Sequence, residues 1–293
     1  MNKFKTMLIN DYRLNKKNLW TPMLVYLIID LLLIIAYFIL KAKIGFENSD
    51  IMNIDIIMAQ KFDVGGFPNS IWYLVGMGVL GIAGFVQVLV ALAIGNHSLN
   101  LERFHKCEIF YRSQPLSIWL YSLSKYIIAI VGPILILILT GIVNLLLIIP
   151  FLSPFMAFNL PDALAGLGVS LLLYSRSILV LGSIGFLISG IFKEKAFIKL
   201  LWIILVLQII LVIAHLTLDF PLINMSEYFT KLINPIGGIG EALRSDSIES
   251  LDNFRQAMEI NTILFNWHTG LQLLVSGIFF GLGVIIYKTK EVI

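Results

Sequence analysis

The chain carries, at residues 119–149, the stretch WLYSLSKYIIAIVGPILILILTGIVNLLLII, in which Lys125 is the only charged residue. A run of about 18 or more apolar residues with almost no charge is long enough to cross a hydrocarbon core roughly 30 Å thick. The backbone of such a run has to satisfy its hydrogen bonds internally, because lipid offers neither donors nor acceptors. Residues 119–149 therefore predict a membrane-spanning helix.

Apolar runs of this kind recur along the chain, separated by polar stretches. We expect them to form six membrane-spanning helices, at residues 20–40, 71–95, 119–149, 163–192, 198–215 and 267–287. The composition agrees, because 58% of the residues are hydrophobic and 13% are charged, against about 25% charged in an average soluble domain. The mean hydropathy is +0.91. The sequence predicts an all-α polytopic membrane protein, with residues 1–293 in one transmembrane domain and the first span retained rather than cleaved as a signal.

The distribution of Lys and Arg predicts the orientation of these helices. Most of the 21 basic residues lie before the first span, between the second and third, between the fourth and fifth, or after the sixth. In the opposite segment at residues 216–266, acidic residues outnumber basic ones. Because basic segments stay on the cytoplasmic side, we expect both termini in the cytoplasm and the chain in the cell membrane. The net charge of +3 does not indicate a nucleic-acid partner.

Three segments outside the spans carry patterns of their own. Residues 1–19 repeat apolar side chains at helical spacing, which predicts an amphipathic helix in the membrane interface that leads directly into the first span. Residues 96–117 predict a second amphipathic helix on the cytoplasmic side, which needs a partner surface to be stable. Residues 216–266 are too long for a simple connection, so we expect short re-entrant or interfacial helices before the last span.

The loop between the second and third spans resembles that of the membrane subunits of type-2 ATP-binding-cassette (ABC) exporters, the permeases. Glu102 is followed by Pro115, Ser117 and, as the next span begins, Lys125, an order that this family often shows. The family's frequent Gly-Thr pair is replaced here by Lys-Cys at residues 106–107. The layout of spans resembles the same family over the whole chain.

A second stretch that resembles the family lies just before the last span. The family often has an Asn-Pro pair and a Glu-Ala-Leu-Arg pattern there, and the matching residues here are Asn234, Pro235, Glu241 and Arg244. No Walker A signature, GxxxxGK followed by Ser or Thr, occurs in the sequence. An ATP-driven role therefore needs a partner that binds the nucleotide.

The resemblance implies that the loop after the second span contains a coupling helix that docks on an ABC ATPase subunit. It assigns this contact to Glu102, Arg103, Phe104, Lys106 and Glu108. It also implies that two such chains, or one chain and a homologue, sit over two ATPase subunits that bind ATP and Mg. The complex would export a hydrophobic or amphipathic substrate, and this chain would hold no catalytic residue, metal or cofactor.

Two other classes of function stay open from the sequence. A membrane-embedded enzyme is one, because Glu102, His105 and Glu108 recur every three residues and neighbouring side chains on a helix can converge on a metal. A non-transporting immunity or sensor protein built on the same scaffold is the other. An adjacent gene for an ATPase would favour the exporter over both.

Three charged residues lie inside the predicted spans: Asp30, Lys125 and Arg176. A lone charge at the centre of a membrane helix costs about 2.5 to 3.5 kcal/mol, so such residues usually find a partner or water. One hypothesis pairs Asp30 with Arg176 and thereby joins the first and fourth spans. In the alternative, Lys125 and Arg176 reach toward opposite interfaces while Asp30 is protonated or capped by a hydroxyl group.

The predicted orientation can be tested with an impermeant thiol reagent on intact cells. Cys107 is the only cysteine, so its replacement by Ser gives a background for single cysteines. We expect Lys290→Cys to resist the reagent, because basic ends stay inside, and Ser247→Cys, in the acidic segment before the last span, to react. Labelling of residue 290 with protection of residue 247 would contradict this orientation.

Overall fold

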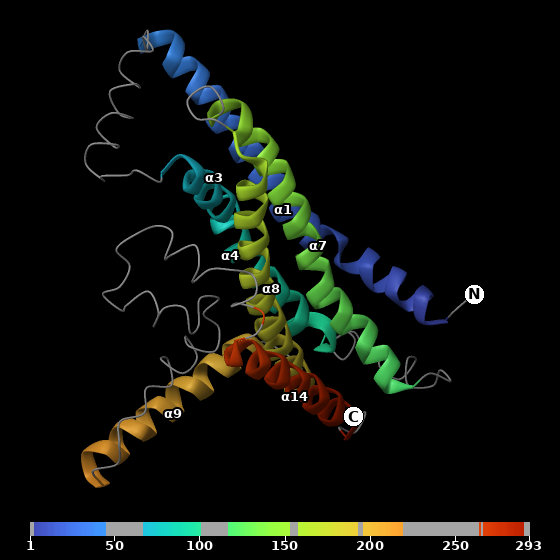
Figure 1. The fold of residues 1–293 in the computed structure, drawn as a ribbon. Coiled ribbons are helices and arrows are strands. Elements are labelled where there is room, and N and C mark those ends of the chain that lie inside the picture. The colour runs from blue at the N-terminus through green and yellow to red at the C-terminus, as the bar shows by residue number, and fades with distance from the viewer. Residues whose placement is uncertain are drawn as a thin grey trace.

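The structure, a computed structural model, describes residues 3–44, 67–100, 117–152, 158–192, 196–218, 264 and 266–289. Its helices are α1 (Lys3–Ile44), α3 (Phe67–Gly78), α4 (Gly81–Ser98), α7 (Ile118–Leu152), α8 (Leu160–Ile191), α9 (Ala196–Leu218) and α14 (Trp267–Thr289) (Figure 1). Within the described ranges every regular element is a helix, so the predicted all-α class is confirmed there.

Five helical stretches are long and apolar enough to cross a membrane: Phe4–Ala36, Trp72–Ser98, Ile118–Pro150, Leu160–Ile191 and Trp267–Thr289. Each of them contains or overlaps one of the predicted spans. The remaining predicted span, 198–215, lies within α9, whose described apolar part is the shorter stretch Trp202–Ile213. The chain is therefore a multi-pass membrane protein.

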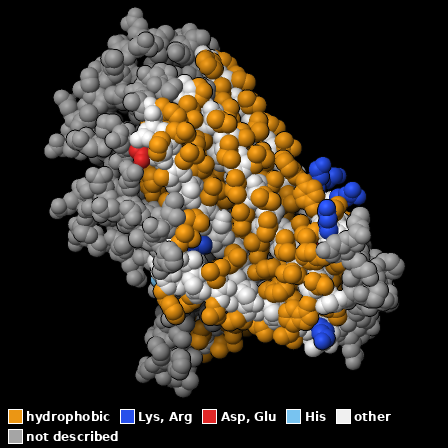
Figure 2. Space-filling view, turned by 45° about the vertical axis from the view of Figure 1, so that its right-hand side comes forward, with side chains coloured by type: hydrophobic (Ala, Val, Ile, Leu, Met, Phe, Trp, Pro, Cys, Tyr) orange, Lys and Arg blue, Asp and Glu red, His pale blue; other side chains and the backbone are white. Residues whose placement is uncertain are grey.

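The surface of the described helices suits contact with lipid. Large apolar side chains such as Leu32, Leu135 and Leu146 are exposed, which is unfavourable in water and acceptable in hydrocarbon. On the face drawn in Figure 2, hydrophobic side chains cover the middle, and most of the visible Lys and Arg side chains lie toward one edge. The start of α1 and the end of α14 lie toward the same end of the molecule (Figure 1).

The N-terminal segment is not a separate helix. α1 runs for 42 residues from Lys3 to Ile44, through Pro22 and through the predicted boundary at residues 19–20. At about 1.5 Å per residue it is roughly 63 Å long, about twice the thickness of the hydrocarbon core. α1 is therefore longer than the core is thick, and the N-terminal segment continues into the first span as one helix.

The second predicted span, 71–95, is divided into α3 and α4 at residues 79–80. Leu80 has φ −98° and ψ 1°, outside the helical region. Glycines flank the interruption at Gly78 and Gly81, and glycine weakens a helix because it lacks a Cβ. α7, by contrast, continues through Pro133.

α8 is the central helix, and it contacts α3, α4, α7, α9 and α14. It begins at a capped end, where the Asn159 side chain accepts a hydrogen bond from the backbone N–H of Asp162. Glycines allow close approach to its neighbours: a Cβ on Gly185 would lie 2.6 Å from the carbonyl oxygen of Leu92 in α4. On α14 the glycine that approaches α8 is Gly283.

The close packing of α8 on α4 predicts that small additions are costly there. Gly185→Ala should lower the free energy of unfolding by about 1–3 kcal/mol, because the new Cβ would overlap the α4 backbone. Thermal unfolding of the purified protein in detergent measures the change. Gly281→Ala is the matched control, since a Cβ there meets no described atom within 4 Å. Equal midpoints for the two variants would contradict this packing.

Candidate functional site

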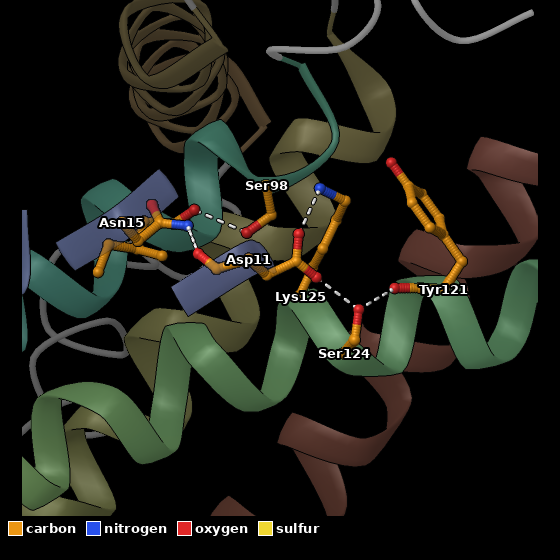
Figure 3. A network of polar contacts seen from close by, with 7 residues as sticks. Asp11, Asn15, Ser98, Tyr121, Ser124 and Lys125 are labelled. Atoms are coloured by element: carbon orange, nitrogen blue, oxygen red, sulfur yellow. Dashed lines mark hydrogen bonds and ion pairs between the residues drawn. The ribbon is translucent and has the colours of Figure 1, made fainter. Parts of the chain in front are cut away.

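A buried polar cluster lies where the first half of α1 meets the end of α4 and the start of α7 (Figure 3). Its centre is Asp11 of α1, which contacts Ser124 and Lys125 of α7. Asp11, Leu19 and Met23 are spaced by multiples of four and share one face of α1. Because Leu19 and Met23 pack into the core with residues of α4 and α7, the same face brings Asp11 against α7.

Two donors hold the Asp11 carboxylate. Ser124 Oγ donates to Asp11 Oδ2 at 2.6 Å, and Lys125 Nζ forms an ion pair with Oδ1 at 3.3 Å. The exposed fractions are 6% for Asp11, 0% for Ser124 and 8% for Lys125. Asn15, one turn further along α1, donates from Nδ2 to the backbone oxygen of Asp11 at 3.0 Å. Charge-assisted bonds of this kind are stronger than neutral ones, and burial strengthens them further.

α7 offers both of these donors a second acceptor. Ser124 Oγ also lies 2.9 Å from the backbone oxygen of Tyr121, and Lys125 Nζ lies 5.0 Å from the centre of the Tyr121 ring, within cation–π range. A hydroxyl group has a single proton, so Ser124 can bond either to the carboxylate or to its own helix. The contact between α1 and α7 therefore has a local alternative in which Ser124 and Lys125 turn to Tyr121.

The end of α4 beside this cluster is also polar. Ser98 Oγ donates to the backbone oxygen of Ile94 at 2.7 Å, and Asn100 Nδ2 donates to that of Asn96 at 2.9 Å. The Oδ1 atoms of Asn96 and Asn100 are buried and accept no hydrogen bond from the described residues. In the sequence this polar end of α4 leads directly into residues 101–116, and α7 begins two residues after them.

A second buried polar group lies between α8 and α14. Arg176 Nε donates to Gln272 Oε1 at 2.7 Å, and the exposed fractions are 9% for Arg176 and 3% for Gln272. The Nη1 and Nη2 atoms of Arg176 are buried and bond to no described residue. Ser276, one turn after Gln272, has a buried Oγ that likewise lacks a described partner.

The structure overturns the hypothesis that Asp30 pairs with Arg176. The bond from Arg176 goes to Gln272, and Asp30 Oδ2 is buried with no hydrogen-bond partner among the described residues. Lys125 does not reach out to the interface, because its Nζ is buried against Asp11. Of the three intramembrane charges singled out by the sequence, none contacts another; Lys125 and Arg176 each take a partner that had not been singled out.

The residues that the resemblance assigns to the coupling segment and to the segment before the last span lie outside the described residues. These are Glu102, Arg103, Phe104, Lys106 and Glu108 of the coupling segment, and Asn234, Pro235, Glu241 and Arg244 before the last span. The alternative metal ligands His105 and Glu108 lie outside them as well. In the described part of the chain, no three His, Cys, Asp or Glu side chains gather as metal ligands would. The assignments in both segments stay predictions.

Sequence reasoning missed Asp11 and Gln272. Asp11 follows Phe4 by seven residues and Leu8 by three, so it falls on the apolar face of the N-terminal helix. An acidic residue on that face, together with a Lys in an otherwise uncharged span, was a signal that could have been used. For Gln272 there was no comparable signal, because a single polar amide in a span has many possible partners.

No protein-family model matches this chain, and neither a curated protein nor a solved structure does. The case for its function therefore rests on the chain's own residues, on their geometry and on the resemblance of the two sequence stretches described above.

The buried pair predicts strong coupling between Asp11 and Lys125. Asp11→Asn and Lys125→Met should each lower the free energy of unfolding by about 3–5 kcal/mol, because each leaves a buried group without its partner. The double variant should be more stable than the sum of the single losses allows. Thermal unfolding in detergent measures all three. Lys16→Met, at an exposed position on the same helix, is the control and should change little; additive losses would contradict a buried pair.

Proposed function

We propose that this chain is the membrane subunit, or permease, of an ABC exporter driven by a separate ATPase subunit. Two stretches of sequence, before the third and the last spans, support the family, and the multi-pass all-α fold suits a permease. In this proposal the chain lies in the cell membrane with both termini in the cytoplasm. It acts as a pair with a second copy or a homologue, and it exports a hydrophobic or amphipathic substrate.

The observation that carries the mechanism is the buried contact between Asp11 and Lys125. Lys125 lies about two turns into α7, and α7 follows directly on the segment proposed to dock on the ATPase. A force on that segment moves the start of α7, and the pair transmits the movement to α1. Ser124 and Lys125 have Tyr121 as a second acceptor. The contact between α1 and α7 can therefore open while these two side chains keep an interaction within α7.

In this mechanism the nucleotide is bound by the ATPases, at a distance from the substrate. The ATPases bind ATP and Mg and close on each other, and the coupling segment is displaced with them. α1 and α7 then shift relative to α8, which is held to α4 by close backbone contacts. This shift changes the end of the bundle from which the substrate can enter or leave.

Charge reversal in the coupling segment tests this function. Glu102→Lys combined with Arg103→Glu keeps the net charge and places like charges against the partner, which costs several kcal/mol at an interface. We expect the tagged double variant to recover at least about tenfold less ATPase from native membranes than the unchanged chain. Quantitative mass spectrometry of the purified complexes measures the ratio.

A control for this experiment is Lys288→Glu combined with Glu291→Lys, which reverses two charges after the last span without changing the net charge. It should recover the ATPase normally. If the unchanged chain recovers no protein with a Walker A signature, or if the Glu102 and Arg103 variant recovers as much as the control, the proposed function is wrong.

A further inference from the structure

Arg176 is held in a fixed orientation inside the bundle. Its Nε donates to Gln272 Oε1 at 2.7 Å, and this bond fixes the plane of the guanidinium group. The two Nη atoms remain, and they are buried without an acceptor among the described residues. Ser276 Oγ, on the same face of α14 as Gln272, is a further buried hydroxyl without a described partner.

An arrangement of this kind is unsatisfied in a membrane. Arginine keeps its proton in proteins and has five N–H donors and no acceptor. Leaving buried donors of a charged group unpaired is among the costliest arrangements in a protein interior. The geometry therefore calls for an acceptor, and the positive charge calls for an acceptor that carries negative charge.

The described residues do not supply that acceptor. Their acidic side chains are Asp11, Asp30 and Asp162. Asp11 pairs with Lys125, and Asp162 accepts a hydrogen bond from Asn159 Nδ2 at 2.6 Å. Asp30 forms no bond to Arg176, because Nε of Arg176 bonds to Gln272 and its two Nη atoms bond to no described residue. Within this part of the chain Arg176 has no anionic partner.

The depth of Arg176 points to a ligand that reaches into the bilayer. Arg176 precedes the end of α8 at Ile191 by about 22 Å, at about 1.5 Å per residue. Gln272 follows the start of α14 at Trp267 by about 7 Å on the same scale. With both termini in the cytoplasm, the group lies in the outer part of the membrane. Leu271 and Leu273, which flank Gln272 along α14, are exposed and give an apolar surface at the edges of the helix face that carries Gln272.

We propose that Arg176, Gln272 and Ser276 form a binding site for the anionic group, phosphate or carboxylate, of an amphipathic molecule. The two free Nη atoms match the paired oxygens of such a group, which Arg binds in a bidentate way. Ser276 supplies a further donor, and the exposed leucines of α14 take the apolar part. That this molecule is the exported substrate rests on the proposed function, whereas the binding itself does not.

Binding of two lipids that differ in headgroup charge tests the site. The probes are phosphatidylglycerol, which is anionic, and phosphatidylcholine, which is zwitterionic, each with the same fluorescent label on an acyl chain. They are titrated into the full chain in a neutral detergent, and fluorescence anisotropy gives each affinity. We expect the unchanged protein to prefer phosphatidylglycerol by about tenfold or more, the size of one charge-assisted contact.

The variants separate this site from general attraction to positive charge. Arg176→Gln should abolish the preference for the anionic lipid. Arg176→Lys should weaken it, because Lys keeps the positive charge but lacks the planar pair of N–H donors that binds two oxygens at once. Lys288→Gln removes one exposed charge from the same helix, α14, and should keep the preference. Where Arg176→Gln does not elute as a single folded species, Arg176→Lys decides in its place.

Three results would overturn the proposal. One is equal affinity of the unchanged protein for the two lipids, and another is an unchanged preference in the folded Arg176 variants. The third is displacement of the labelled lipid by millimolar inorganic phosphate, which would identify a small free anion rather than an amphipathic molecule. Because the titration needs no ATPase, a chain that binds the lipid but recruits no ATPase refutes the proposed function and leaves the site intact.

Discussion

Lipid gives membrane helices no hydrophobic reason to associate, so this bundle depends on how closely the backbone of α8 can approach its neighbours. Glycines on α8 and on the facing helices remove the Cβ atoms that would hold them apart, as at Gly185 against Leu92. The same holds where Gly190 of α8 meets Gly283 of α14. Dispersion contacts over these faces then hold α8 at the centre, and the other helices take their places around it.

The two buried polar groups differ in how far they are satisfied, and the difference separates their roles. The carboxylate of Asp11 receives hydrogen bonds from both a hydroxyl and an ammonium group, so this carboxylate is satisfied and joins α1 to α7. The guanidinium of Arg176 uses one nitrogen and leaves two, so its cluster is complete only with a further molecule. The first group suits the transmission of movement, and the second suits recognition.

The helices could be predicted from the sequence because each span carries its own evidence, in length and in lack of charge. Their partners could not. Asp11 and Lys125 are 114 residues apart, and no local pattern shows which charges meet when helices pack. The predicted pairing of Asp30 with Arg176 was wrong for that reason. The similar depth of the two residues in the membrane allowed the contact, but the packing of α8 on α14 places Arg176 against Gln272 instead. The break at Leu80 was also missed, although Gly78 and Gly81 mark it in the sequence.

In the proposed exporter, the segment between α4 and α7 rests on an ATPase. A photo-crosslinking amino acid placed at Phe104, in cells that express the full chain at its native level, tests this contact directly. Irradiation followed by mass spectrometry identifies what lies within reach of that side chain. We expect a crosslink to a subunit that carries a Walker A signature. Crosslinks confined to lipid or to this chain would contradict it.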